Sequence, residues 1–198
     1  MRAFGNVHVA RLTLLAAVAA LSACIVEAPT NEKTPAAGGA AAIPTTSGGL
    51  MAQGRPGSIK SGALLDGKLE LVGAQFVPAR VVPGMTTRIA MGFRVVELVP
   101  DNDSIFVHVE DSESHAQIAN LDHLPSVGRP TSTWKKGEVV RDDFTLTLPA
   151  GSATRAVSVY VGLWNPATDQ RLTVTNPDKV ATDGNNRVML VTLPVAAQ

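Results

Sequence analysis

Alternation of apolar and polar residues in the second half of the chain sets the strongest limit on its fold. Apolar side chains occupy every second position in four segments: Ile89, Met91, Phe93 and Val95; Ile105, Val107 and Val109; Val157, Val159, Val161 and Leu163; Met189, Val191, Leu193 and Val195. A period of two puts these residues on one face of a β-strand. Turn formers such as Pro83-Gly84 and Asp183-Gly184 separate the segments. The pattern predicts a single antiparallel, immunoglobulin-like β-sandwich of about seven or eight strands.

Composition divides the chain into a folded part and a part with little to bury. Between Ile25 and Leu65, 26 of 41 residues are Ala, Gly, Pro, Ser or Thr, and none is aromatic. Such a segment is expected to be a disordered tether. Seven of the eight aromatic residues lie between Phe76 and Trp164. We therefore predict a signal peptide at 1–23, a lipidated cysteine and tether at 24–65, and the β-sandwich at 66–198.

The first residues have the features of an export signal. Arg2 and Arg11 precede Leu12 to Leu21, a predominantly apolar run of ten residues. A membrane span needs about 20 residues, so the run is too short to cross a bilayer but suits a secretory signal. The sequence Leu-Ser-Ala-Cys that ends at Cys24 resembles the lipobox of bacterial lipoproteins. An ordinary signal peptide with a cysteine nearby is the alternative.

The lipobox resemblance carries several expectations. It implies cleavage before Cys24, a diacylglycerol on its thiol, and usually an acyl chain such as palmitate on the new amino terminus. Two or more chains are enough for stable membrane anchoring. Ile25, not Asp, follows the cysteine. By the sorting rule of enteric-type lipoproteins, this implies an exported protein of the bacterial cell envelope, on the outer membrane rather than the inner one.

Charge argues against a nucleic-acid partner. The chain has 17 basic and 17 acidic residues. Removing the signal peptide with Arg2 and Arg11 leaves 15 against 17, and no basic run. Nucleic-acid-binding proteins carry a basic patch or stripe. We therefore expect no nucleic-acid partner for this chain.

Catalytic motifs are poorly supported. Ser132 and Lys135 have the S-x-x-K spacing of a serine nucleophile and its lysine base. That chemistry needs the serine at the start of a helix, together with S-D-N and K-T-G elements. This serine follows Arg129-Pro130 in a turn-rich segment, and both companion motifs are missing from the sequence. The chain is therefore not expected to be an enzyme, and no cofactor is expected.

Metal binding has little support from residue spacing. His108, His115 and His123 lack the tight spacing of zinc ligands, so we interpret them as strand-face and loop residues. The run from Asp101 to Asp103 has part of a calcium-loop pattern without its glycine and terminal glutamate. An ordinary Asp- and Asn-rich turn explains it more simply. Calcium at an end of the sandwich remains an alternative.

Aromatic residues are the candidate binding groups. Trp164 and Tyr160 fall on the strand face opposite Val159, Val161 and Leu163, where an aromatic ring could stack on a sugar. Trp164 at the end of its strand could equally cover the edge of the core, and this is the favoured reading. Trp134 has the same two alternatives.

One acidic residue sits where apolar residues are expected. Asp142 shares the core-facing phase of its strand with Val140, Phe144, Leu146 and Leu148. A buried carboxylate is costly unless it is hydrogen-bonded. Asp142 is therefore predicted near a sandwich end, accepting bonds from backbone amides of the preceding loop. In that place it would brace the loop that carries Trp134.

Two segments, PTSTWKKGEVVRDDFTLTLP and VSVYVGLWNPATDQRLTV, resemble a β-sandwich module of bacterial envelope proteins. The module also forms the soluble C-terminal part of some membrane glycosyltransferases. The matching positions are Pro130, Thr131, Trp134, Gly137, Asp142, Gly162, Leu163, Arg171 and Leu172. The resemblance implies the fold and no assigned activity. It adds Arg171 to the candidate binding residues.

These observations together predict a non-enzymatic surface lipoprotein. It would be held on the membrane by its lipid and present one β-sandwich for binding or assembly, to an envelope protein or a glycan. The alternative is a carbohydrate-binding module that uses Trp134, Trp164 and Tyr160. A weaker alternative is an accessory or degenerate hydrolase.

Overall fold

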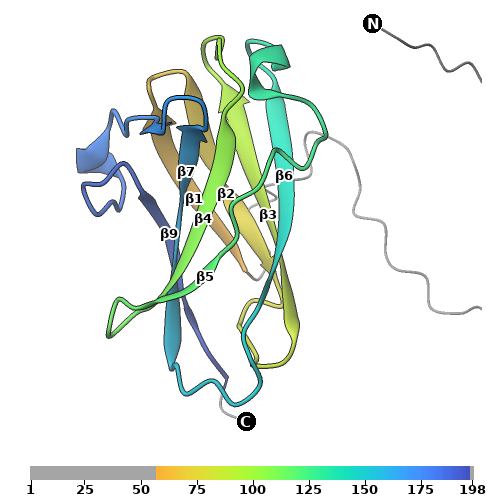
Figure 1. Cartoon of the computed structure of the whole chain (residues 1–198), viewed down its shortest axis with the longest axis vertical. Coiled ribbons are helices and arrows are strands. Elements are labelled where there is room, and N and C mark those ends of the chain that lie inside the picture. The colour runs from red at the N-terminus through yellow and green to blue at the C-terminus, as the bar shows by residue number, and fades with distance from the viewer. Residues whose placement is uncertain (1–56, 197–198) are drawn as a thin grey trace, which may run out of the picture. The chain divides into compact units, whose positions relative to one another are not determined.

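The computed structural model describes residues 57–196 and shows two packed β-sheets (Figure 1). The described residues form nine strands and two short 3-10 turns, η1 (Thr131–Thr133) and η2 (Pro177–Lys179). Every strand pairing is antiparallel. The predicted all-β sandwich is confirmed, with one or two more strands than expected. Within this part of the chain, no helix has the length and apolar character needed to cross a membrane.

Each sheet is built from strands that come from both halves of the domain. The first sheet has the order β1 (Ser58–Leu65), β2 (Leu69–Val77), β3 (Thr86–Val95) and β6 (Val139–Thr147). The second sheet has the order β5 (Gln117–Asn120), β4 (Ser104–Asp111), β7 (Ala156–Asn165) and β8 (Gln170–Arg171), with β9 (Val188–Pro194) also paired to β7.

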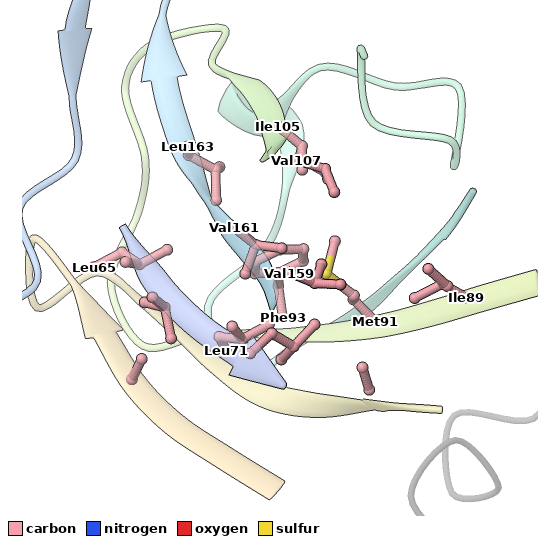
Figure 2. Packing of buried hydrophobic residues seen from close by; sticks show 14 of the residues in the cluster. Leu65, Leu71, Ile89, Met91, Phe93, Ile105, Val107, Val159, Val161 and Leu163 are labelled. Atoms are coloured by element: carbon pink, nitrogen blue, oxygen red, sulfur yellow. The ribbon is translucent and has the colours of Figure 1, made fainter. Parts of the chain in front are cut away.

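The core fills the space between the two sheets. Figure 2 shows Met91 and Phe93 of β3 meeting Val159 and Val161 of β7. All four side chains are at most 1% exposed. The alternation in the sequence thus corresponds to the inner faces of strands, and burial of their apolar surface holds the sheets together.

The predicted end of the tether at residue 65 was wrong. Strand β1 pairs with β2 from Ser58↔Gln75 to Leu65↔Leu69, and Ala63 and Leu65 are fully buried. The small residues of β1 resemble those of a tether in composition, but they belong to a strand. Gly62 lies at an irregularity in that strand and adopts a φ of 79°. The signal peptide, Cys24 and the rest of the predicted tether lie outside the described residues.

Segments outside the strands close both sides of the sandwich. Beside β1, the amide of Thr175 bonds Leu64 O at 2.8 Å, and the Asn176 side chain bonds Leu64 N and Gly62 O. Beside β4, His123 and Ile105 exchange two backbone bonds of 2.9 Å. Covered edges cannot pair with other chains.

The two ends of the sandwich differ. Strands β1, β3 and β7 finish at the upper end in Figure 1, which carries the β1–β2 turn, the β3–β4 connection and the β7–β8 turn. Strand β1 begins partway down the sandwich in Figure 1, where Ser58 pairs with Gln75 of β2. The described chain therefore enters the fold away from the β7–β8 turn.

Candidate binding site

The outer face of the second sheet carries a layer of aromatic and charged side chains. Phe106 and His108 of β4 stand beside Gly162 and Tyr160 of β7, in the register Phe106↔Gly162 and His108↔Tyr160. Phe106 is 2% exposed and Tyr160 7% exposed. A sandwich normally leaves its outer face in water. Here the chain between β7 and β9 covers part of it.

Gly162 allows this layer to pack tightly. A Cβ atom at this position would lie 2.3 Å from Cζ of Phe106, so only glycine fits beneath the ring. The guanidinium of Arg171 lies over the Phe106 ring, 4.8 Å from its centroid, and donates to Asn185 O at 3.1 Å. Stacking on an aromatic ring is a favourable position for an arginine. The Phe106 ring thus lies against both Gly162 and Arg171.

A second arginine covers Tyr160. The guanidinium of Arg187 lies 4.3 Å from the Tyr160 ring centroid and pairs with Glu110 and Asp183, each at 2.5 Å. Although burial lowers the pKa of Arg187, its bonds to Asp183 and Glu110 raise it above the usual value. This cluster seals Tyr160 from solvent.

A hollow of about 140 Å³ opens in this layer, beside the end of β7 and the start of β4. It is lined by Phe106, His108, Asp122, Trp164, Asp169 and Arg171. We call it the Trp164 hollow. Trp164 is partly exposed, and its Nε1 is buried with no hydrogen-bond partner among the described residues. The lining combines an aromatic face with hydrogen-bond donors and acceptors.

The charge of the Trp164 hollow comes from Arg171 and two carboxylates. Burial lowers the pKa of His108, and Arg171 and Arg187 add to the effect, although Asp122 opposes it. His108 is therefore neutral at pH 7, with Nε2 3.6 Å from Asp122 Oδ1. Asp122 Oδ1 also accepts a 2.9 Å bond from the amide of Val107, which fixes the carboxylate at the rim.

The structure separates the three aromatic residues that were predicted to bind sugar. Trp134 is 1% exposed and packs against Phe93, with ring centroids 6.1 Å apart. Tyr160 lies beneath Arg187. Neither ring is therefore open as the sugar-binding alternative requires, because each has another side chain on the face a sugar would need, and Trp134 fits the other alternative of a core residue. Trp164 lines the outer hollow instead of the core edge, and Arg171 lies beside it, paired through β8.

The segment around Trp134 forms a corner of the fold. The hydroxyl of Thr131 donates to Asp101 O at 2.7 Å and accepts from Asp103 N at 2.8 Å. Gly137 turns the chain with a φ of 82° into β6. The conformation at Gly137 favours glycine. The Pro-Thr-x-x-Trp segment thus clamps the β3–β4 connection and anchors itself in the core.

Asp142 is fully buried in the core-facing phase of β6, opposite Met91 of β3 and so within the sheet, not at the sandwich end that was predicted. Its Oδ1 accepts a 2.8 Å bond from Ser126 N, and its Oδ2 lies 2.9 Å from Nε2 of His123. The carboxylate thus holds residues 123–126, a part of the preceding loop that comes before Trp134. His123 was interpreted as a loop residue, and its contact with Asp142 was not foreseen.

The S-x-x-K residues do not form a catalytic pair. Ser132 lies in the single turn η1 and donates to Asn102 Oδ1 at 2.5 Å. Among the described residues, no hydrogen bond joins Ser132 to Lys135. In residues 57–196, no three His, Cys, Asp or Glu side chains are arranged to hold a metal ion.

A further acidic residue emerges only from the structure. Asp103 is 3% exposed, and its carboxylate has neither a hydrogen bond nor an ion pair within residues 57–196. Burial, with the nearby charge of Asp101, raises its pKa to about 6. Its place before a strand gave no signal of burial, since an Asp-Asn-Asp run is typical of a turn.

Comparison with known proteins finds similar solved structures. No family model matches the chain, and no curated protein matches it. Among solved structures, one similar to this chain is described as the crystal structure of the C-terminal domain of wzt. The two are 16% identical with a TM-score of 0.48, over 73% of this chain and 83% of the other.

Proposed function

We propose that the chain is a lipid-anchored protein of the bacterial cell envelope whose β-sandwich binds a glycan in the Trp164 hollow. One observation carries the glycan part. Trp164 and Arg171, from the two strands of one hairpin, line the same hollow as Asp122 and Asp169. Sugars present apolar ring faces and hydroxyl groups that both donate and accept. An aromatic face beside charged hydrogen-bonding groups complements both features.

Binding rather than catalysis is the proposed activity. A general base and a nucleophile must lie within hydrogen-bond reach of one another. In the Trp164 hollow His108 is neutral and 3.6 Å from Asp122, and the hollow is lined by no serine, threonine or cysteine. Assembly with an envelope protein is the alternative role.

Glycan binding is tested on an array of mono-, di- and tetrasaccharides of glucose, galactose, mannose and N-acetylglucosamine. The wild-type sandwich is expected to bind at least one series, and Trp164→Ala to lose that binding. Trp164→Phe keeps an aromatic face and serves as the matched control. An array that stays blank for the wild type rejects the glycan proposal.

The anchor is tested separately. Cys24→Ser removes the thiol that would carry the lipid, so the protein is expected to move from the membrane fraction to the soluble fraction. A Cys24→Ser protein that stays on membranes contradicts lipid anchoring at this residue. The array result does not depend on this outcome.

A further inference from the structure

A second hollow lies next to the first at the upper end of the sandwich. Its volume is about 210 Å³. It is lined by Asp66 and Lys68 of the β1–β2 turn, Asp101 and Asp103 of the β3–β4 connection, and Gln170 and Arg171 of β8. We call it the Asp103 hollow. Arg171 also lines the Trp164 hollow, so the two hollows are neighbours that share this residue.

Asp103 is the feature that calls for a ligand. Asp103 lines this hollow and is only 3% exposed. Its carboxylate has no hydrogen bond or ion pair within the described residues. Its carboxylate oxygens are not fully buried, so they can be reached from the hollow. Its backbone amide donates to Thr131, which holds the main chain at this point. The carboxylate is thus open to hydrogen-bond donors of a molecule bound in the hollow.

The remaining lining indicates what kind of molecule this is. Lys68 and Arg171 offset much of the charge of the carboxylates, and Asp66 already accepts a 2.7 Å bond from Thr173 N. Within residues 57–196 no group of acidic side chains is placed to hold a metal ion. Gln170 adds an amide, which both donates and accepts. Such a mixed lining suits a neutral molecule with several hydroxyl groups.

We propose that the Asp103 hollow is a second sugar subsite, in which Asp103 accepts hydrogen bonds from hydroxyl groups of the unit next to the one in the Trp164 hollow. This inference rests on the proposed glycan function. Arg171, between the hollows, would contact both units. The preferred glycan is then an oligomer rather than a single sugar.

The test compares chain lengths on the same array and by calorimetry with the series that binds. Asp103→Asn is expected to weaken binding of the tetrasaccharide roughly tenfold, as for loss of one bond to a charged group. Binding of the monosaccharide is expected to stay within about twofold, since the Trp164 hollow is intact. Asp178→Asn, on the exposed turn η2, is the matched control.

Each outcome separates the two proposals. If Asp103→Asn binds the tetrasaccharide as tightly as the wild type, the second subsite is wrong and the Trp164 site stands. If the wild type binds no saccharide, the glycan function and the subsite both fail. Should Asp103→Asn not fold, Gln170→Ala tests the same hollow, because Gln170 is exposed and does not line the Trp164 hollow. Unchanged length dependence in Gln170→Ala then overturns the subsite.

Discussion

Nε2 of His123 lies 2.9 Å from Oδ2 of Asp142, and this contact joins the segment beside β4 to strand β6. Nδ1 of the same ring lies 2.6 Å from Leu121 O. Both neighbours are acceptors, so both ring nitrogens are placed to donate, as they do in the protonated imidazole. The contact thus ties the segment beside β4 to the first sheet.

Replacing Asp142 by alanine is expected to lower the free energy of unfolding by about 3 kcal/mol, because the Ser126 amide and His123 lose their acceptor. Asp143→Ala is the control. Its side chain is exposed and bonds only Arg141, so we expect a loss of about 0.5 kcal/mol or less. Urea unfolding measures both. Equal losses in the two variants would show that Asp142 has no bracing role.

The His123–Asp142 pair makes stability depend on pH. Burial lowers the pKa of His123, but its bonds to Asp142 and Leu121 O outweigh this and raise the pKa above its ordinary value. A raised histidine pKa stabilises the fold below pH 6.5, and the contribution is lost as pH rises through the folded-state pKa. We expect His123→Gln to make the fall in unfolding free energy above pH 6.5 shallower. Unfolding curves from pH 5.5 to 8.5 measure the slope, and an unchanged slope contradicts the assignment to His123.

Asp103 is an acid, but like His123 it has a raised pKa, so its contribution to stability also falls as pH rises. Its pKa is raised to about 6, so the folded state favours the protonated acid. The resulting stabilisation is present at low pH and is lost as pH rises through about 6. Asp103→Asn is therefore expected to increase the unfolding free energy at pH 7.5 by about 1–2 kcal/mol, and to have little effect near pH 4. Thermal unfolding at both pH values measures this. A loss of stability at pH 7.5 would mean that the carboxylate has a structural partner.

The two tryptophans differ in stability cost and in exposure. Trp134→Ala removes a buried ring that packs on Phe93, and about 3–5 kcal/mol of unfolding free energy should be lost. Trp164→Ala should cost less, because its ring is partly exposed. In the single-tryptophan proteins Trp134→Phe and Trp164→Phe, acrylamide should quench Trp164 more strongly than Trp134. Equal quenching would place both rings in the same environment.

Gly162→Ala tests the layer beneath Arg171. The added Cβ would meet the Phe106 ring, so the ring must move and Arg171 with it. We expect a loss of about 1–3 kcal/mol from this overpacking, together with weaker saccharide binding. The double variant Gly162→Ala with Phe106→Leu should recover part of the stability, which urea unfolding measures. No recovery would mean that the ring does not cause the loss.

The core residues and the burial of Asp142 among them can be predicted from the sequence, because both follow from a period of two. Asp142 falls among core residues by phase alone, and burial then demands hydrogen bonds. The site depends instead on register between distant strands. Phe106 meets Gly162 only once β4 pairs with β7, and Arg171 reaches Phe106 only through β8. No local pattern encodes these pairings. The burial of Tyr160 and Trp134 could therefore not be predicted from the residues next to them in sequence.

The point at which the described chain enters the sandwich also bears on how the protein is presented. Strand β1 begins at Ser58, whereas residues of the β7–β8 hairpin line both hollows. Leu65, at the end of β1, is the β1 residue nearest to the Asp103 hollow, because Asp66 lines it. The described chain therefore enters the fold several residues away from either hollow. In the proposed lipid-anchored protein, a change in the length of chain before Gly57 is expected to alter the distance of the hollows from the membrane without altering the residues that line them.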